Sequence, residues 1–128
     1  DLYLAHPAVI TSMQERSNYI AFPVAKTDDW CFDTDAVGKI THIDTASDHP
    51  CHQMLGLSYW TAEDGARLAA CANALYAEEQ YRQLYWDEIA LKYYLPEFSI
   101  YIRECRREDV WEIDTVEELR ELEARGQV

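Results

Sequence analysis

One junction constrains the fold of this chain more than any other feature, because a strand pattern passes directly into a helix pattern at Thr61. Residues 52–61 (HQMLGLSYWT) are rich in branched and aromatic side chains and predict a β-strand. Residues 62–77 (AEDGARLAACANALYA) carry apolar side chains at helical spacing and predict a helix that Thr61 caps. The junction therefore predicts a fold that contains both a sheet and helices.

Shorter patterns along the chain predict further elements of both kinds. The other predicted strands are residues 17–26, 30–34, 39–44, 98–105 and 110–113. The other predicted helices are residues 81–94, which end before Pro96, and residues 116–125, which Thr115 caps. Strands and helices alternate only in the second half of the chain. The predicted fold class is α/β, with a mixed sheet, flanking helices and a β-hairpin at residues 30–44.

The acidic balance of the chain limits its partners. Its 128 residues, about one ordinary domain, include 24 acidic and 11 basic residues and give a formal charge of −13. That charge argues against a nucleic-acid backbone or an anionic membrane surface as the main partner. It fits a cationic ligand, a metal ion or simply good solubility. With no apolar stretch long enough for a membrane span and no visible signal peptide, the sequence predicts a cytoplasmic protein.

Several common site signatures are missing from the sequence. The cysteines are far apart and form no C-x-x-C pair, so we expect free thiols in the core at Cys31, Cys51, Cys71 and Cys105. The segment DHPCH (48–52) places two histidines and a cysteine together, but zinc requires a fourth ligand that is not evident. The four glycines are scattered, so the chain contains no glycine-rich loop for the phosphates of a nucleotide.

Two segments place aromatic side chains beside acids. In LYWDE, Tyr85 lies one predicted helical turn from Tyr81 and two residues before Asp87. Aromatic side chains at that spacing usually belong to a core, but a wall of rings beside a carboxylate also suits a quaternary ammonium group. Trp30 stands among the acids of DDWCFD and is open to the same two interpretations.

A third segment, VWEIDTVEEL (110–119), carries two acids on one side of a predicted strand. The period of two places Val110, Glu112 and Asp114 on the same face. Two carboxylates on one face repel each other if they are buried without a cation. They either face solvent at the end of the strand, or Asp114 is a ligand of a divalent cation at the carboxyl end of the strand.

Six fragments, taken in order, resemble the C-terminal part of CTP:phosphocholine cytidylyltransferases, which are bacterial relatives of the sugar-phosphate nucleotidyltransferases. The fragments are DLYL, DDWCFD, GKITHI, GLSYW, LYWDE and WEIDTVEEL. The resemblance covers nearly the whole chain. It implies a Rossmann-like nucleotidyltransferase fold and a reaction in which CTP and phosphocholine give CDP-choline and pyrophosphate, with Mg²⁺ as cofactor.

The resemblance also implies a role for particular residues. Asp1, the acid of DLYL, and Asp114, the acid of EID, correspond to the catalytic metal ligands. The implied choline-binding residues are Trp30, Tyr85, Asp87 and Glu112. These residue types suit phosphocholine, because its nitrogen carries a fixed positive charge and no hydrogen-bond donor. The reaction needs no covalent protein intermediate, so positioning and metal charge would supply most of the catalysis.

The sequence departs from the family pattern in one respect, because the glycine-rich G-x-G-x-R segment that binds CTP in the family is not in it. We therefore expect residues 1–128 to be a single substrate-binding domain, the C-terminal part of a longer enzyme, with little or no turnover alone. Half of a sheet exposes an edge, which allows two copies to pair as a homodimer. Two other hypotheses stay open: a fragment of a sugar-1-phosphate nucleotidyltransferase, and a non-catalytic module whose acidic face binds a basic partner.

Overall fold

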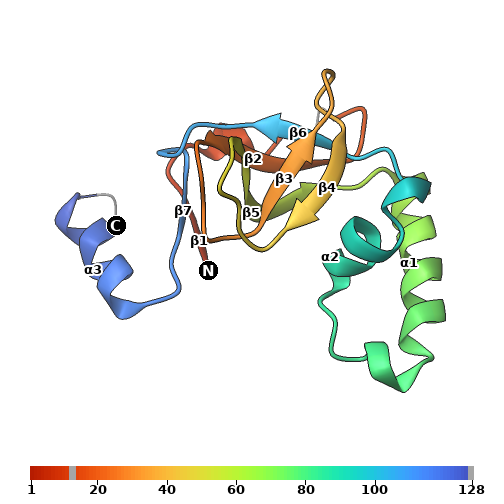
Figure 1. Ribbon diagram of the computed structural model, residues 1–128. Coiled ribbons are helices and arrows are strands. Elements are labelled where there is room, and N and C mark those ends of the chain that lie inside the picture. The colour runs from red at the N-terminus through yellow and green to blue at the C-terminus, as the bar shows by residue number, and fades with distance from the viewer. Residues whose placement is uncertain (12–13, 127–128) are drawn as a thin grey trace. The chain divides into compact units, whose positions relative to one another are not determined.

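The computed structural model describes residues 1–11 and 14–126, and the chain divides into two compact units (Figure 1). Unit 1 combines segments from both ends of the chain, within residues 1–13 and 105–128. Unit 2 is the continuous segment 14–104. The assignment of residues 1–128 to a single substrate-binding domain stays a prediction.

Unit 2 is built on a five-stranded mixed sheet with the strand order β4-β3-β5-β2-β6 (Figure 1). Strand β6 runs parallel to β2, and the other neighbouring strands are antiparallel. The strands are β2 (Asn18–Val24), β3 (Cys31–Thr34), β4 (Ile40–Asp44), β5 (Cys51–Tyr59) and β6 (Tyr101–Glu104). The predicted mixed sheet is confirmed, since each of these strands overlaps a segment that the sequence predicts to be extended.

The predicted hairpin joins β3 to β4 through a short turn. Gly38 has a φ of +81°, a left-handed backbone angle that glycine adopts without steric cost. The carboxylate of Asp35 accepts hydrogen bonds from the backbone N–H groups of Val37 and Lys39 at 3.0 and 2.9 Å. One exposed charged side chain and one glycine therefore hold this turn.

The junction between β5 and the helix α1 (Ala62–Tyr76) has the predicted cap at Thr61. The Thr61 hydroxyl accepts a hydrogen bond from the N–H of Asp64 at 3.2 Å. Ser17, which precedes β2, ties this junction to the sheet. Its hydroxyl accepts from the N–H of Thr61 at 3.0 Å and donates to the Asp64 carboxylate at 2.6 Å. These contacts fix the point at which α1 leaves the sheet.

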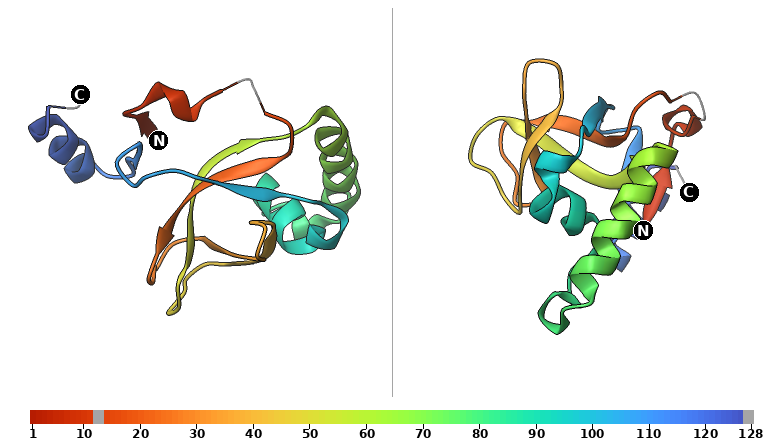
Figure 2. Two further views of the ribbon diagram at one scale, coloured as in Figure 1. Left: turned by 90° about the horizontal axis from the view of Figure 1, so that it is seen from above. Right: turned by 90° about the vertical axis from the view of Figure 1, so that its right-hand side faces the viewer.

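The core of unit 2 lies on one face of the sheet, where the helical segments pack (Figure 2). In β2, Tyr19 and Ala21 point into this core, while the intervening Ile20 is buried outside it, as a period of two requires. Full burial of each large apolar side chain stabilises the fold by about 1.5–3 kcal/mol. The buried residues of this core are Tyr19, Ala21, Phe32, Ile40, Cys71, Leu75, Ile89, Ala90, Leu91, Phe98 and Ile100.

The predicted continuous helix at residues 81–94 is wrong in its first part, because the chain is helical from residue 86 to residue 93 but not from residue 82 to residue 85. The helical segments are η2 (Glu79–Tyr81), α2 (Trp86–Glu88) and the π-helix η3 (Ile89–Tyr93), followed by η4 (Leu95–Glu97). Tyr85 has φ −67° and ψ 148°, an extended conformation that separates η2 from α2. Tyr81 and Tyr85 therefore do not share a helical face. Burial of residues 89–91 in the core, rather than helical spacing, sets the backbone here.

Unit 1 contains a two-stranded antiparallel ribbon and a helix. Strand β1 (Leu2–Leu4), followed by the short helix η1 (Pro7–Val9), pairs with β7 (Val110–Glu112), which leads into the helix α3 (Val116–Ala124). Thr115 caps α3 as predicted, because its hydroxyl accepts from the N–H of Glu118 at 3.2 Å. Gly126, with a φ of +69°, lies just past the end of α3, also as predicted.

The four cysteines were expected to be free thiols in the core. No disulfide joins the four cysteines, and the thiols of Cys31, Cys51 and Cys71 are buried as expected, whereas Cys105 is partly exposed. Burial, with a smaller effect of the Cys51 side chain, raises the pKa of Cys31 to about 12, so this thiol is protonated at neutral pH. Within residues 1–11 and 14–126, no helix has both the length and the apolar character that a membrane crossing requires.

Candidate functional site

The two predicted metal ligands, Asp1 and Asp114, lie at the same end of the β1–β7 ribbon in unit 1. The Ile113 N–H donates to the Asp1 carbonyl at 2.7 Å, and the Asp1 amino group donates to the Ile113 carbonyl at 3.1 Å. This pair of hydrogen bonds continues the ladder in which Leu2 lies opposite Glu112. Backbone pairing thus brings two acids from distant parts of the sequence together.

The side chains of Asp1 and Asp114 are both largely exposed, and Glu112, one residue inside the ribbon, is also exposed. Mg²⁺ is typically held by one or two carboxylates together with substrate phosphates, so this donor set fits that ion. No group of three or more His, Cys, Asp or Glu side chains in the described residues forms a complete metal site. The metal role of Asp1 and Asp114 stays a prediction.

Glu118 holds the backbone at the turn after Asp114. Its Oε2 accepts hydrogen bonds from the N–H of Asp114 at 2.9 Å and from the N–H of Thr115 at 2.8 Å. These bonds, with that from Asp114 contributing most, hold the pKa of Glu118 below its ordinary value. Glu118 therefore fixes the backbone at Asp114, between β7 and α3.

The predicted ammonium-binding residues Tyr85 and Asp87 lie in unit 2, where Tyr85 precedes α2 and Asp87 lies within it. The Tyr76 hydroxyl of α1 donates to the carbonyl of Leu84 at 2.9 Å and anchors the chain just before Tyr85. The two aromatic side chains that follow are exposed, Tyr85 by 72% and Trp86 by 48%. Neighbouring exposed apolar side chains of this size are typical of binding surfaces.

Aromatic rings connect this segment to the core. The ring of Trp60, which follows β5, makes edge-to-face contacts with Trp86, Tyr19 and Phe98 at centroid distances of 6.1, 6.1 and 5.8 Å. Its Nε1–H donates to the Ser58 hydroxyl at 3.0 Å. Contacts of this kind contribute about 0.5–1.5 kcal/mol each beyond the area they bury. We call these four rings (Tyr19, Trp60, Trp86 and Phe98) the aromatic cluster.

Asp87 directly follows Trp86 of the aromatic cluster and is partly buried. Burial raises the pKa of Asp87 above its ordinary value, although backbone N–H groups partly offset the effect. The pKa of Tyr19 is also raised, first by burial and then by the charge of Asp87. A poorly solvated carboxylate near aromatic rings gains from binding a cation, because the cation replaces part of the lost solvation.

Tyr19 carries a buried hydroxyl without a partner, so we expect Tyr19→Phe to leave the fold at least as stable as before. The residue is 0% exposed, and its hydroxyl makes no hydrogen bond in the described structure. Removing an unsatisfied buried hydroxyl recovers up to about 1 kcal/mol, which denaturant unfolding would measure. A loss of stability of that size would instead mean that the hydroxyl bonds to Ser58, which lies opposite Tyr19 in the ladder and lowers its pKa.

Trp30, the other predicted wall of the ammonium site, lies in the segment that leads into β3 of unit 2. Its side chain is partly buried, and its carbonyl accepts from the N–H of Met54 at 2.8 Å. Among the described residues, the ring contacts near Asp87 come from the aromatic cluster, and none involves Trp30. Tyr85 and Asp87 lie close together because they are two residues apart in the sequence. A role for Trp30 in the same site stays a prediction.

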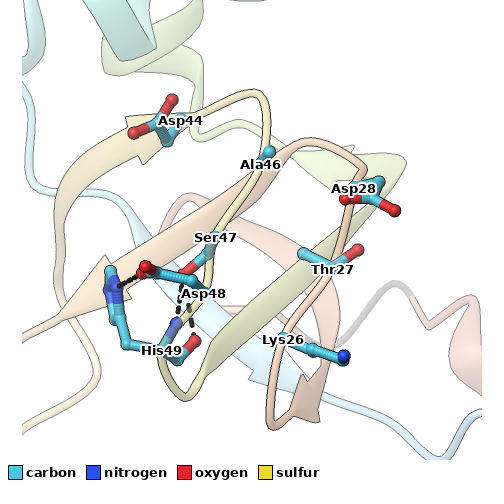
Figure 3. A pocket seen from close by; sticks show the side chains of 8 residues that line it. All are labelled: Lys26, Thr27, Asp28, Asp44, Ala46, Ser47, Asp48 and His49. Atoms are coloured by element: carbon cyan, nitrogen blue, oxygen red, sulfur yellow. Dashed lines mark hydrogen bonds and ion pairs between the residues drawn. The ribbon is translucent and has the colours of Figure 1, made fainter.

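A concave pocket of about 560 Å³ lies between the β2–β3 and β4–β5 loops of unit 2 (Figure 3). Two backbone hydrogen bonds, at 3.0 and 2.8 Å, join Thr27 to Ser47 across it. His49 Nε2 lies 2.9 Å from Asp33 Oδ1, and this contact raises the pKa of His49. The lining residues are Lys26, Thr27, Asp28, Asp44, Ala46, Ser47, Asp48 and His49. The predicted site residues do not line this pocket.

Sequence reasoning did not identify the members of the aromatic cluster as neighbours of Asp87. Trp60 and Trp86 stand in GLSYW and LYWDE, two of the fragments that carry the family resemblance. The resemblance could therefore have indicated both tryptophans as candidate site residues. Tyr19 offers no such signal, because its pattern is that of any buried residue in an alternating strand.

Comparison with known proteins identifies relatives of this chain, although no family model matches it. A 2-aminoethylphosphonate cytidylyltransferase from Lancefieldella rimae is 32% identical over 120 residues, which cover 93% of this chain and 48% of that protein. A choline-phosphate cytidylyltransferase from Streptococcus pneumoniae is 31% identical over 68 residues, which cover 53% of this chain and 29% of that protein. The chain is a partial homologue of the cytidylyltransferases.

Comparison of structures supports this relationship at the level of the fold. The chain matches a solved structure of CTP:phosphocholine cytidylyltransferase from Streptococcus pneumoniae with a TM-score of 0.79 and 23% identity, covering 98% of this chain and 54% of that one. The mixed sheet and its helices thus correspond to part of a nucleotidyltransferase fold. This cytidylyltransferase homologue spans about half the length of the Lancefieldella relative and of the solved structure.

Proposed function

We propose that this chain is the acceptor-binding part of a cytidylyltransferase that transfers CMP from CTP to phosphocholine, or to a close analogue that joins an amine cation to a phosphate or phosphonate. The products are CDP-choline, or the corresponding CMP conjugate, and pyrophosphate. In this proposal the residues that bind CTP belong to a part of the enzyme outside this chain. Residues 1–128 alone then have little or no turnover.

The observation that carries the proposal is the half-buried Asp87 beside the aromatic cluster. Its raised pKa reports poor solvation of the carboxylate, and the neighbouring Tyr85 and Trp86 expose their rings. A positive charge with little hydration of its own is the ligand that such a surface stabilises best. Trp30, also in unit 2, is the remaining aromatic residue proposed for this acceptor site, and the role implied for Glu112 of unit 1 stays a prediction.

The acids of unit 1 supply the second part of the proposed chemistry. Asp1 and Asp114 would hold Mg²⁺, whose charge stabilises the phosphates of CTP when it is bound. Their exposed carboxylates, at one end of a hydrogen-bonded ribbon, suit that role. The remaining contribution of this chain is to orient the acceptor phosphate for attack on the α-phosphorus of CTP, which requires no protein nucleophile.

The head group of 2-aminoethylphosphonate is a second candidate, because the match to the Lancefieldella protein covers 93% of this chain. A primary ammonium donates hydrogen bonds, which Asp87 can accept directly. A trimethylammonium has no donor and depends on charge and on aromatic faces, such as those of Tyr85 and Trp86. The two acceptors therefore use the same surface in different ways.

A comparison of acceptors tests the proposal. The complete protein would be assayed for pyrophosphate release from CTP and Mg²⁺ with phosphocholine, 2-aminoethylphosphonate, phosphoethanolamine or a hexose-1-phosphate. We expect the kcat/KM for an amine-bearing acceptor to exceed that for the sugar by at least about a hundredfold, because a sugar leaves the half-buried Asp87 carboxylate without a cation. A preference for the sugar would identify a sugar-1-phosphate nucleotidyltransferase, and no turnover would favour a non-catalytic acidic module.

A further inference from the structure

Glu88 is a buried acid to which the proposed chemistry assigns no part. It directly follows Asp87 and is 8% exposed. A glutamate with so little exposure is uncommon unless its carboxylate is paired or hydrogen-bonded, because ionised groups lose much solvation on burial. The partners of Glu88 therefore indicate what it does.

Both carboxylate oxygens of Glu88 have partners close in sequence. Oε2 accepts a hydrogen bond from the N–H of Tyr85 at 2.9 Å, and Oε1 lies 3.8 Å from Nζ of Lys92. In the opposite direction, the N–H of Glu88 donates to the carbonyl of Tyr85 at 3.1 Å. Tyr85 and Glu88 are thus joined in both directions, as in a helix capping box. Trp86 and Asp87 lie between them, in the first turn of α2.

The chain is anchored on both sides of this turn. Before it, the Tyr76 hydroxyl of α1 holds the carbonyl of Leu84, as described above. After it, residues 89–91 of the π-helix are at most 1% exposed in the core. Single π-helical turns inside helical segments occur frequently at functional sites. Between these anchors, the Glu88 carboxylate holds the backbone of Tyr85, while the Trp86 ring packs against Trp60.

We propose that Glu88 is a positioning residue for the amine of the acceptor. It acts through the backbone of Tyr85 and sets the geometry with which Tyr85 and Asp87 meet the same cation, without contacting that cation itself. The inference rests on the proposed function, because it assigns the effect of Glu88 to acceptor binding. It goes further in one respect: loss of Glu88 should weaken binding of the acceptor and leave binding of CTP unchanged.

Three variants of the complete protein test this role: Glu88→Ala, Glu88→Gln and, as a matched control, Asp35→Ala. Asp35 is also a carboxylate of unit 2 that accepts backbone N–H bonds, but it holds the β3–β4 turn. The acceptor is whichever amine compound gives the highest kcat/KM with the wild-type protein. The acceptor KM, the CTP KM, kcat and the melting temperature would be measured for each variant.

We expect Glu88→Ala to raise the acceptor KM about tenfold and to change the CTP KM by less than about twofold. Glu88→Gln keeps an oxygen that accepts from the Tyr85 N–H, so it should recover most of the acceptor affinity. Glu88→Ala and Asp35→Ala should lower the melting temperature by similar amounts, because each removes a carboxylate that accepts backbone hydrogen bonds. Asp35→Ala should leave the acceptor KM unchanged. These outcomes would separate a positioning effect from a general loss of stability.

Two results would overturn the inference while leaving the proposed function intact. One is an active Glu88→Ala protein whose acceptor KM equals that of the wild type. The other is an equal rise of the acceptor KM in Glu88→Ala and Asp35→Ala, which would reduce Glu88 to a stabilising contact. If the wild-type protein transfers no CMP to any acceptor, the proposed function itself fails. Amide hydrogen exchange then still tests the turn, because Glu88→Ala should speed exchange at the N–H of Tyr85.

Discussion

The Asp114→Asn variant of the complete protein should lose at least about a hundredfold in kcat at saturating Mg²⁺, CTP and acceptor. A metal ion contributes several kcal/mol of charge stabilisation in phosphoryl and nucleotidyl transfer, and the neutral amide is a much weaker ligand for Mg²⁺ than the carboxylate. The change is nearly isosteric, and the backbone N–H that Glu118 holds is retained, so the fold should persist. Steady-state pyrophosphate release over a Mg²⁺ titration would measure the loss.

Glu117→Gln is a suitable control for that experiment. Glu117 is an exposed acid in the first turn of α3, three residues from Asp114, and its replacement removes the same charge from the same unit. We expect the control to retain nearly full activity. Equal activity of Asp114→Asn and the wild type would return Asp114 to the simpler interpretation, a solvated acid at the end of a strand.

The second large expected effect is that of Asp87→Asn, which should weaken acceptor binding without lowering the stability of the protein. Asp87→Asn should raise the acceptor KM by about tenfold to a hundredfold, because a poorly solvated charged contact contributes about 1.5–3 kcal/mol. The CTP KM should stay unchanged. Burial raises the pKa of Asp87, so its ionised form is less favourable in the folded protein than in the unfolded chain. The neutral amide should therefore leave the melting temperature equal or higher.

The pH dependence of the same variant follows from the sign of the shift. As the pH rises from below the unfolded pKa through the raised folded pKa, the wild-type protein should lose stability relative to Asp87→Asn. Acceptor affinity should change in the opposite direction and weaken as the pH falls through the folded pKa, since the carboxylate that attracts the cation is then protonated. A variant that is less stable than the wild type but binds acceptor normally would contradict both parts of this account.

Local patterns in the sequence were sufficient for most of the regular elements. The hairpin around Gly38, the cap of α1 at Thr61 and the cap of α3 at Thr115 each depend on residues close in sequence. Their hydrogen bonds and backbone angles form within a few residues, so residue type and spacing determine them. The ribbon of β1 with β7 was not predicted as a pair, because nothing local to Asp1 indicates that Ile113 lies beside it.

The segment around LYWDE could not be predicted from spacing, because tertiary contacts decide its conformation. Tyr81 and Tyr85 have helical spacing, but the Glu88 carboxylate and the buried residues 89–91 favour an extended Tyr85 and a π-helix. The aromatic cluster is non-local as well, since it joins Tyr19 of β2 to rings that follow in distant segments. Asp87 was singled out by the aromatic residues beside it and by the family resemblance, and its role in acceptor binding stays a prediction. The structure adds that burial raises its pKa.

One measurement tests the central claim most directly: mass spectrometry of the products that the complete protein forms from CTP, Mg²⁺ and an amine-bearing phosphate or phosphonate. The account predicts pyrophosphate together with a new compound in which CMP is joined to the acceptor, formed only when the acceptor is present. Phosphocholine and 2-aminoethylphosphonate would be supplied separately, each with a reaction lacking Mg²⁺. Unchanged CTP with both acceptors, from a protein shown to be folded, would contradict the assignment of this chain to cytidylyl transfer.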